Sequence, residues 1–178
     1  MSEPHRPRLA WALTGSGHYL RECLELIAQT PDVDLFLSRA AGEVLAMYGH
    51  DPRRLRDRIR CYRDTTASAP PVGFFYHGRY RGLVIAPATS NTVAKMVWGI
   101  SDTLVTNVYA QAGKCRIPSI VFACDTEPAM ETEAPGGQVM VYPRRIDLEN
   151  VDRLSTFEHT TVVKRFDELV AALGRLDG

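Results

Sequence analysis

The chain has 178 residues, of which 45% are hydrophobic and 24% are charged, values close to those of ordinary globular proteins. Its 21 basic side chains equal its 21 acidic ones, so no overall field favours nucleic acid or an anionic membrane. Length and composition therefore exclude disorder and a fibrous architecture. They favour a single domain over residues 1–178 with a small-molecule partner.

The cysteine spacing indicates whether the chain binds a metal, and the N-terminal sequence indicates where in the cell the protein is located. The cysteines are Cys23, Cys61, Cys115 and Cys124, and none stands in a Cys-x-x-Cys pair or at ligand spacing from a histidine. This spacing disfavours zinc and iron–sulfur sites, so we expect no metal. The N-terminus is polar, and the chain has no run of about 18 apolar residues. These features predict a cytoplasmic protein with reduced thiols and no membrane partner.

The first part of the sequence alternates short apolar runs with helical patterns. Residues 9–14 predict a buried strand that enters a glycine-rich turn at 15–17. Apolar residues at three- and four-residue intervals then predict a helix over 20–28. Residues 33–37 predict a second strand, and Ser38 is a candidate N-cap for a helix that reaches about residue 48. The β-α unit is thus repeated.

The middle of the chain carries signals for one helix and one strand. Asp51 followed by Pro52 predicts the start of a helix, with five arginines between residues 53 and 60 scattered around it. Residues 65–71 form a polar loop that ends in prolines. Residues 82–86 then predict a third strand, apolar throughout, as expected for a strand buried on both faces of a parallel sheet.

The same alternation continues to the C-terminus. Two helices are predicted, over 91–99 and 101–113, followed by a fourth strand at 117–123. The segment 137–178 carries, in order, a strand at 139–142, a helix at 148–154, an apolar run at 161–163 and a helix ending near residue 173. We expect this segment to cover the sheet edge. The whole pattern predicts a single α/β domain of the flavodoxin-like or Rossmann-like type, a doubly wound parallel sheet in three α/β/α layers.

Three loops follow predicted strands, where ligands bind to an open parallel sheet. They begin at Gly15, Ser38 and Pro87. Glycines let the backbone approach an anion, and hydroxyl groups at a helix N-terminus supply donors, so a phosphate suits these loops. Gly15-Ser16-Gly17 is not the full Gly-x-Gly-x-x-Gly fingerprint, which disfavours a nicotinamide cofactor, and such a turn also occurs as a plain strand-to-helix connection.

Two motifs resemble a known family. Residues 86–95 read Ala-Pro-Ala-Thr-Ser-Asn-Thr-Val-Ala-Lys, and residues 99–104 read Gly-Ile-Ser-Asp-Thr-Leu. Both are similar to motifs of the homo-oligomeric flavin-containing cysteine decarboxylase superfamily, or flavoprotein family. Matches at 73–75, 79–80, 117–118 and 124–125 bring the chain closer to the archaeal-type flavoproteins and the acceptor-dependent dihydromethanopterin reductases. The resemblance extends over roughly residues 8–126.

The resemblance implies a non-covalently bound FMN. Its phosphate would lie in the loop 89–92, and its ribityl chain and ring near 15–17 and 38–40. The cofactor-binding residues that we predict are Gly15, Ser16, Gly17, Ser38, Arg39, Ala40, Pro87, Ala88, Thr89, Ser90, Asn91, Thr92, Thr103 and Cys124. The family also implies homo-oligomers built from trimers, with the flavin site at a subunit boundary.

The function implied by this resemblance is an FMN-dependent oxidoreductase. It would reduce a dihydropterin, similar to dihydromethanopterin, to the tetrahydro form by hydride transfer. An external electron donor is implied, because the chain has neither a nicotinamide fingerprint nor a ferredoxin-like cysteine set.

Other family activities remain open. The alternatives are an electron-transfer flavoprotein and a non-redox role as a flavin prenyltransferase, decarboxylase or dipicolinate-synthase-like subunit. Decarboxylases of the family carry a Pro-x-Met-Asn-x-x-Met-Trp clamp after the last core strand, together with an essential histidine. Residues 122–131 lack that clamp, which disfavours decarboxylation.

Three further residues, and Cys124 from the set above, each allow a second interpretation. We interpret His77 as a surface histidine, while His18 either approaches the cofactor or is a capping or exposed residue. Cys124 either lines the flavin site or is a small buried residue. Asp102 is either a flavin or subunit contact or, as we favour, a carboxylate near a helix N-terminus. We assign no catalytic residue.

Overall fold

The computed structural model describes residues 7–51, 59–66 and 69–177. The strands are β1 (Arg8–Leu13), β2 (Val33–Leu37), β3 (Arg60–Arg63), β4 (Tyr80–Ala88), β5 (Ser119–Ala123), β6 (Met130–Ala134), β7 (Gly137–Val141) and β8 (Thr160–Val163). The helices are α1 (Leu20–Gln29), α2 (Arg39–Met47), α3 (Ser90–Val97), α4 (Leu104–Lys114), α5 (Arg145–Leu154) and α6 (Phe166–Asp177), with a 3-10 helix η1 (Pro70–Phe75). Within these residues no helix is long and apolar enough to cross a membrane.

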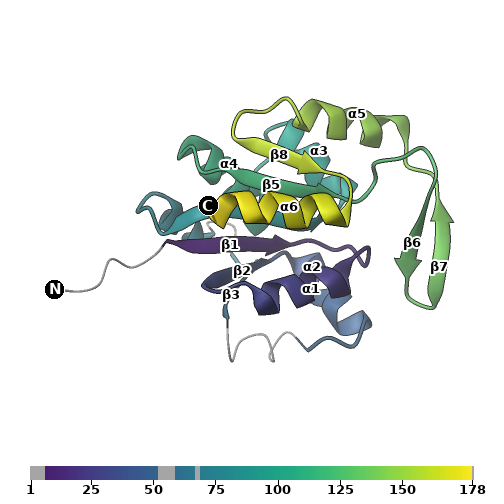
Figure 1. The fold of residues 1–178 in the computed structure, drawn as a ribbon, viewed down its shortest axis with the longest axis horizontal. Coiled ribbons are helices and arrows are strands. Elements are labelled where there is room, and N and C mark those ends of the chain that lie inside the picture. The colour runs from purple at the N-terminus through teal and green to yellow at the C-terminus, as the bar shows by residue number, and fades with distance from the viewer. Residues whose placement is uncertain (1–6, 52–58, 67–68, 178) are drawn as a thin grey trace.

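Six strands form one parallel sheet in the order β3-β2-β1-β4-β5-β8 (Figure 1). The strand order reverses between β1 and β4, which is the point where doubly wound sheets bind ligands. This topology confirms the predicted single-domain α/β fold. Apolar runs indicated β1, β2, β4 and β5, because strands buried on both faces carry few polar residues.

The edge strand β3 was not predicted, and the helix proposed upstream of it cannot be placed. Residues 52–58, which carry most of that helix, lie outside the described residues, and Arg60 belongs to β3 instead. The strand has the sequence Arg-Cys-Tyr-Arg and, among the described strands, pairs with β2 alone. Because an edge strand is partly exposed, it lacks the apolar run that marks a central strand.

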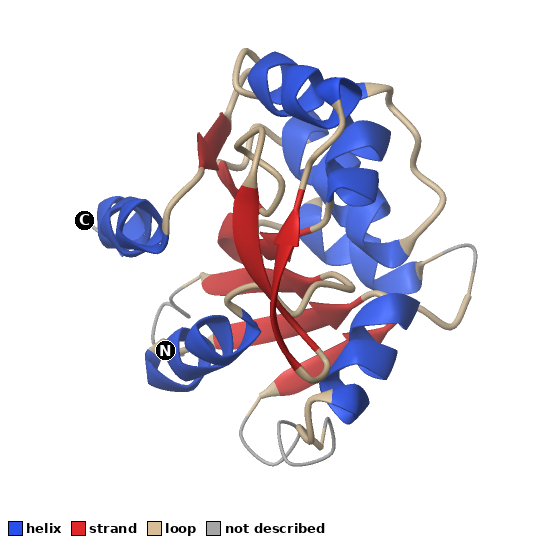
Figure 2. Ribbon diagram, turned by 90° about the vertical axis from the view of Figure 1, so that its right-hand side faces the viewer, coloured by secondary structure: helices blue, strands red, loops and turns tan. Residues whose placement is uncertain are grey.

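Helices cover both faces of the sheet in three layers (Figure 2). One core contains side chains of α1, α2 and α6, and the other contains side chains of α3, α4, α5 and η1. Along β1 the side chains alternate between them, with Leu9, Trp11 and Leu13 in the first core and Ala10 and Ala12 in the second. Each large apolar side chain buried in this way stabilises the fold by about 1.5–3 kcal/mol.

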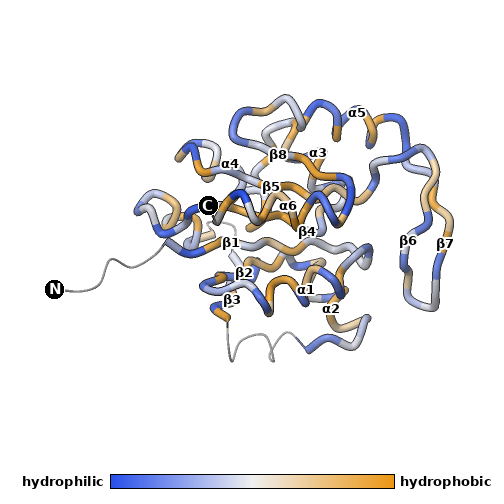
Figure 3. The backbone as a smooth tube through the Cα atoms, in the orientation of Figure 1, coloured by the Kyte–Doolittle hydropathy of each residue, from blue (hydrophilic) through white to orange (hydrophobic). Residues whose placement is uncertain are grey.

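A hairpin stands beside the sheet at the carboxyl ends of its strands. It pairs β6 with β7 in an antiparallel two-stranded sheet, and Figure 1 shows it on the side toward which β1 points. Figure 3 shows β6 as mainly hydrophilic and β7 as mainly hydrophobic. The strand predicted at 139–142 is β7, but the hairpin and its strand β6 were not predicted. After the hairpin, the chain returns to the main sheet. There β8 forms an edge strand and α6 contacts β5.

The opposite end of the sheet contains a buried ionic cluster centred on Asp34. This carboxylate is fully buried in β2 and accepts from Arg8 Nε at 2.7 Å and from the Tyr80 hydroxyl at 2.8 Å. Arg79 lies 2.8 Å from its second oxygen, and the Arg79 guanidinium stacks on Phe74 at 4.4 Å from the ring centre. Arg8 Nη1 also lies 3.2 Å from Asp32 Oδ1, so two carboxylates balance the two guanidinium groups.

Candidate functional site

A buried threonine joins the two main loops at the switch point of the sheet. Thr14 follows β1 and is only 1% exposed. Its hydroxyl donates to the Pro87 carbonyl at 2.8 Å and accepts from the Thr89 backbone N–H at 2.9 Å. Because these bonds use both the donor and the acceptor of the hydroxyl, they hold the loop after β4 against the end of β1.

The loop after β4 ends at the N-terminus of α3. Thr89 is the N-cap of this helix, and its hydroxyl oxygen accepts from the Thr92 backbone N–H at 3.3 Å. The two threonine hydroxyls also lie 3.0 Å apart. Ser90 and Asn91 occupy the first turn, where backbone N–H groups have no partner within the helix.

A second helix N-terminus faces the same space. Ser38 caps α2 by accepting from the Ala41 backbone N–H at 3.0 Å, and Arg39 is the first residue of that helix. Gly15 lies against this turn, because a Cβ atom on residue 15 would lie 2.6 Å from Ala40 Cβ. The glycine is therefore required for the close packing of the β1 loop on α2.

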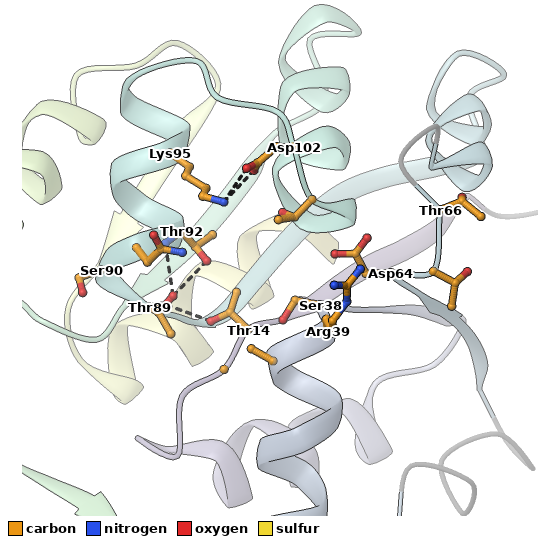
Figure 4. Close-up of a pocket in the computed structure, with 15 residues that line it drawn as sticks. Thr14, Ser38, Arg39, Asp64, Thr66, Thr89, Ser90, Thr92, Lys95 and Asp102 are labelled. Atoms are coloured by element: carbon orange, nitrogen blue, oxygen red, sulfur yellow. Dashed lines mark hydrogen bonds and ion pairs between the residues drawn. The ribbon is translucent and has the colours of Figure 1, made fainter.

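These loops enclose a cavity of about 570 Å³ (Figure 4). Its lining residues are Thr14, Gly15, Ser38, Arg39, Ala40, Asp64, Thr65, Thr66, Thr89, Ser90, Asn91, Thr92, Lys95, Asp102 and Thr103. In Figure 4, Thr14 lies between Thr89 and the start of α2. Two helix dipoles thus meet at one cavity, and each favours an anion by about 0.3–1 kcal/mol.

The far wall of this cavity contains an ion pair. Lys95 Nζ lies 2.8 Å from each carboxylate oxygen of Asp102, so its charge is shared with that residue (Figure 4). Thr103 is the N-cap of α4 and forms a capping box with Thr106. The helix predicted from residue 101 therefore begins at Leu104, and Asp102 lies just before its N-terminus, as we favoured.

A second, smaller cavity of about 300 Å³ borders the first, and Gly15 and Thr89 line both. The hairpin and the end of α2 complete its wall. Its lining residues are Gly15, Ser16, Gly17, His18, Val44, Met47, Tyr48, Thr89, Cys124, Asp125, Thr132, Glu133, Ala134, Pro135 and Val141. A Cβ atom on Gly17 would collide with the ring of Tyr48, whose hydroxyl donates to the Glu133 carbonyl at 3.2 Å. Gly17 thus makes room for a contact between α2 and the hairpin.

Cys124 is buried at the carboxyl end of β5. Its thiol donates to Ser16 Oγ at 3.2 Å, and burial raises the pKa of the thiol to about 12. The group therefore stays protonated near neutral pH and is a poor nucleophile. It lines the second cavity as a small, uncharged residue.

The two histidines considered above differ in position. His77 is exposed in the turn that follows η1. His18 is half-buried and lines the second cavity, where its Nδ1 atom lies 3.1 Å from Thr132 Oγ1. It does not cap α1, whose N-cap is Tyr19 without a side-chain capping bond, and its own backbone N–H donates to the Ser16 hydroxyl at 3.1 Å.

The structure brings most of the predicted cofactor-binding residues to these two adjacent cavities. Pro87 and Ala88 line neither, and they act through their carbonyls, which accept from Thr14 and from the Cys124 backbone N–H. The prediction missed six residues of the larger cavity: Thr14, Asp64, Thr65, Thr66, Lys95 and Asp102. Thr14 ended a predicted strand and could have been included, whereas residues 64–66 follow β3, the strand that had no apolar signal.

The comparison with protein families identifies the chain. A family model described as Flavoprotein matches residues 2–175. The chain belongs to the flavoprotein family. Two relatives are dihydromethanopterin reductases (acceptor): the one from Methanosarcina mazei is 40% identical over 141 residues, and the one from Methanocaldococcus jannaschii is 35% identical over 138. These matches cover 72% and 70% of this chain but only 59% and 56% of the two reductases.

Solved structures of other proteins have the same fold as this chain. The crystal structure of Burkholderia xenovorans DmrB in complex with FMN has a TM-score of 0.90 and 57% identity to this chain, and the match covers 97% of this chain and 96% of DmrB. It is described as a cubic protein cage for redox transfer. The phenylacrylic acid decarboxylase of Aquifex aeolicus has a TM-score of 0.64 at 22% identity, covering 96% of this chain and 94% of the decarboxylase, so the likeness shows a shared fold alone.

Proposed function

We propose that this flavoprotein binds FMN non-covalently and uses it to reduce a dihydropterin of the dihydromethanopterin type to its tetrahydro form. The observation that carries the proposal is 57% identity over nearly the whole chain to DmrB, a protein crystallised with FMN. Two relatives named dihydromethanopterin reductase support the choice of substrate.

The larger cavity suits the phosphate of FMN. We propose that the phosphate lies at the loop 89–92, where the first turn of α3 supplies backbone N–H donors and Thr89 holds the turn in place. Arg39 and the N-terminus of α2 add positive potential from the opposite wall. The ribityl chain and ring would then extend toward 38–40 and 15–17, to the border that Gly15 and Thr89 share with the second cavity.

The residues of this site bind and orient, and they supply no nucleophile. Bound FMN would supply the redox chemistry, a hydride to C6 of the pterin accompanied by protonation at N5. The Cys124 thiol, whose pKa is raised to about 12, remains protonated near neutral pH. Thr14 fixes the distance between the two loops, which matters because hydride transfer depends on close positioning of the reacting atoms.

We further propose that the chain forms homo-oligomers built from trimers and accepts electrons from an external donor. The description of DmrB as a cubic cage supports the assembly, since cubic symmetry contains threefold axes. The mass of the purified protein, measured by light scattering, should be a multiple of three chains of 19.8 kDa. A monomer or a dimer would contradict this part of the proposal.

Spectra test the central proposal. The purified protein should be yellow, and acid should release intact FMN, identified by its mass. After anaerobic photoreduction, a dihydropterin should reoxidise the flavin and appear as the tetrahydro product. Reoxidation only by a dye or a redox protein would instead indicate electron transfer, and a colourless protein that does not bind added FMN would refute the proposal.

A further inference from the structure

His18 lies where two segments far apart in the sequence meet, the β1–α1 loop and strand β6. The distance of 3.1 Å from its Nδ1 atom to Thr132 Oγ1 and the edge of the Tyr19 ring, 4.5 Å away between ring centres, hold the imidazole in one orientation. For Nε2, the described part of the chain provides no hydrogen-bond partner. The ring is thus fixed through one nitrogen, and the other is available at the second cavity.

The partner at Nδ1 suits both charge states of the ring. A threonine hydroxyl can donate to a neutral Nδ1 and can accept from a protonated one. Thr132 can therefore keep its bond while the imidazole gains and loses a proton. An ammonium partner could only donate, and would therefore favour the neutral ring.

Three carboxylates surround His18, each from a different part of the chain. They belong to Glu22 of α1, Asp125 after β5 and Glu133 of β6, and their fields raise the pKa of the imidazole. Burial acts in the opposite direction and is the larger effect, so the pKa of His18 lies below its ordinary value. Glu22 also has a buried carboxylate oxygen, Oε2, with no hydrogen-bond partner among the described residues. The resting ring is thus mostly neutral near pH 7, but nearby negative charge stabilises its protonated form.

The cavity that His18 lines is placed for a second ligand. It borders the larger cavity through Gly15 and Thr89, and its volume of about 300 Å³ falls at the lower end of pockets that hold small molecules. A ligand here would lie next to a ligand in the larger cavity. Two reactants held in adjacent cavities meet the geometric requirement for direct transfer of a hydride from one to the other.

We propose that His18 is the proton donor of this site and that it transfers the proton from Nε2 to the pterin ring nitrogen during reduction. This inference rests on the proposed function. In the balanced step, a C–H bond forms at C6 with the two electrons of the hydride, and the π pair of the C=N bond takes the proton to form N–H at N5. The reduced cofactor is oxidised in the same step, and the imidazole regains its proton from solvent.

The experiment compares His18→Gln with His77→Gln, a matched change at an exposed histidine. Reduced protein is mixed anaerobically either with dihydropterin, which takes up a proton, or with ferricyanide, which takes up electrons alone. With dihydropterin, H18Q should be about 10²–10⁴-fold slower than wild type, the usual contribution of general acid catalysis. With ferricyanide, H18Q should match wild type, and H77Q should match wild type with both acceptors.

Two readouts do not depend on turnover. The FMN dissociation constant of H18Q should equal that of wild type, because the proposed role is in proton transfer. In NMR spectra, the His18 ring resonance, assigned by its loss in H18Q, should titrate below the ordinary histidine value. Weaker FMN binding in H18Q would overturn the proposal by making His18 a cofactor contact, and an ordinary titration would contradict the environment on which it rests.

Failure of the inference and failure of the proposed function are distinguishable. Wild-type protein that binds FMN but is not reoxidised by dihydropterin refutes the reductase function, and the role of His18 with it. Normal wild-type reduction with equally fast H18Q refutes only the role of His18. If H18Q does not fold, Thr132→Val keeps the imidazole and removes its partner. This variant should change the His18 titration and slow dihydropterin reduction, and no change in either would overturn the proposal.

Discussion

The two ends of the central sheet use similar polar residues in opposite ways. At the amino end, the Asp34 carboxylate is enclosed by Arg8, Arg79 and the Tyr80 hydroxyl. At the carboxyl end, Thr89 and Ser38 hydroxyls bond backbone N–H groups of their own helices. The first arrangement pairs side chains with each other, whereas the second leaves two helix N-termini facing an open cavity.

This difference separates residues that stabilise the fold from residues that can bind a ligand. A buried carboxylate is tolerated only when its charge is paired, so the Asp34 cluster has no free capacity for another molecule. Capping hydroxyls satisfy one backbone donor each, and the remaining N–H groups of the first turn stay available. The polarity of a residue therefore does not identify the ligand site. The site is identified by polar groups that still lack a partner within the protein.

The largest effect is expected from breaking the amino-end cluster. Asp34→Ala removes the buried carboxylate that pairs with both guanidinium groups, and leaves Arg8 only its exposed partner Asp32. We expect the free energy of unfolding to fall by about 3 kcal/mol, the lower end of the range for a broken buried ion pair, because both arginines keep some contact with solvent. Urea unfolding at constant pH measures the change.

Asp152→Ala is the matched control, since its ion pair with Lys164 at 3.5 Å is exposed on both sides. That variant should lose less than about 1 kcal/mol. Folded D34A should bind FMN as tightly as wild type, because the cluster lies at the other end of the sheet. An equal loss of stability in both variants would show that the cluster is not a stabilising element.

A smaller effect is expected at the carboxyl end. Asn91→Asp places a carboxylate in the first turn of α3, where we propose the FMN phosphate. Repulsion between the two anions should weaken FMN binding at least about tenfold, or roughly 1.4 kcal/mol. The same carboxylate interacts favourably with the helix dipole, so stability without FMN should not fall. Fluorescence titration with FMN gives the affinity.

Gln138→Glu on the exposed strand β7 adds the same charge away from the larger cavity and serves as the control. Its FMN affinity should remain that of wild type. If N91D binds FMN normally while remaining folded, the phosphate must lie elsewhere, and the contrast between the two ends of the sheet would lose its functional meaning.

The smallest effect concerns pH and His18. Because burial holds the pKa of His18 below its ordinary value, the unfolded chain binds more protons than the folded protein between the two pKa values. Stability should therefore fall as the pH drops through about 6.5 and continue to fall until the folded pKa is passed. Unfolding of wild type and H18Q at about pH 7.5 and about pH 5 isolates this contribution.

In H18Q the loss on acidification should be smaller than in wild type, and His77→Gln, the same change at an exposed histidine, serves as the control. Equal losses in wild type and H18Q would indicate that the imidazole is solvated in the folded protein. The proton-transfer role would then lose the half-buried environment on which it depends.

The sequence by itself determined the strands of the sheet interior and the loops at their carboxyl ends. A strand that is buried on both faces of a parallel sheet carries apolar residues in succession. The sequence therefore showed β1, β2, β4 and β5 as short apolar runs. The cap of α2 was also predicted, because Ser38 bonds a backbone group only three residues away. Thr89 caps α3 in the same local way, although the sequence placed the start of that helix at residue 91. Such features depend on near neighbours, which a sequence displays directly.

Only the tertiary structure decided how distant segments complete the site. The edge strand β3 is recognisable by its pairing with β2, and the second cavity exists because the hairpin folds back onto the β1–α1 loop. The contact between His18 and Thr132 spans 114 positions in the chain. Local propensity carries no information about such a pair, because its distance follows from strand register, helix packing and the direction in which the hairpin leaves β5.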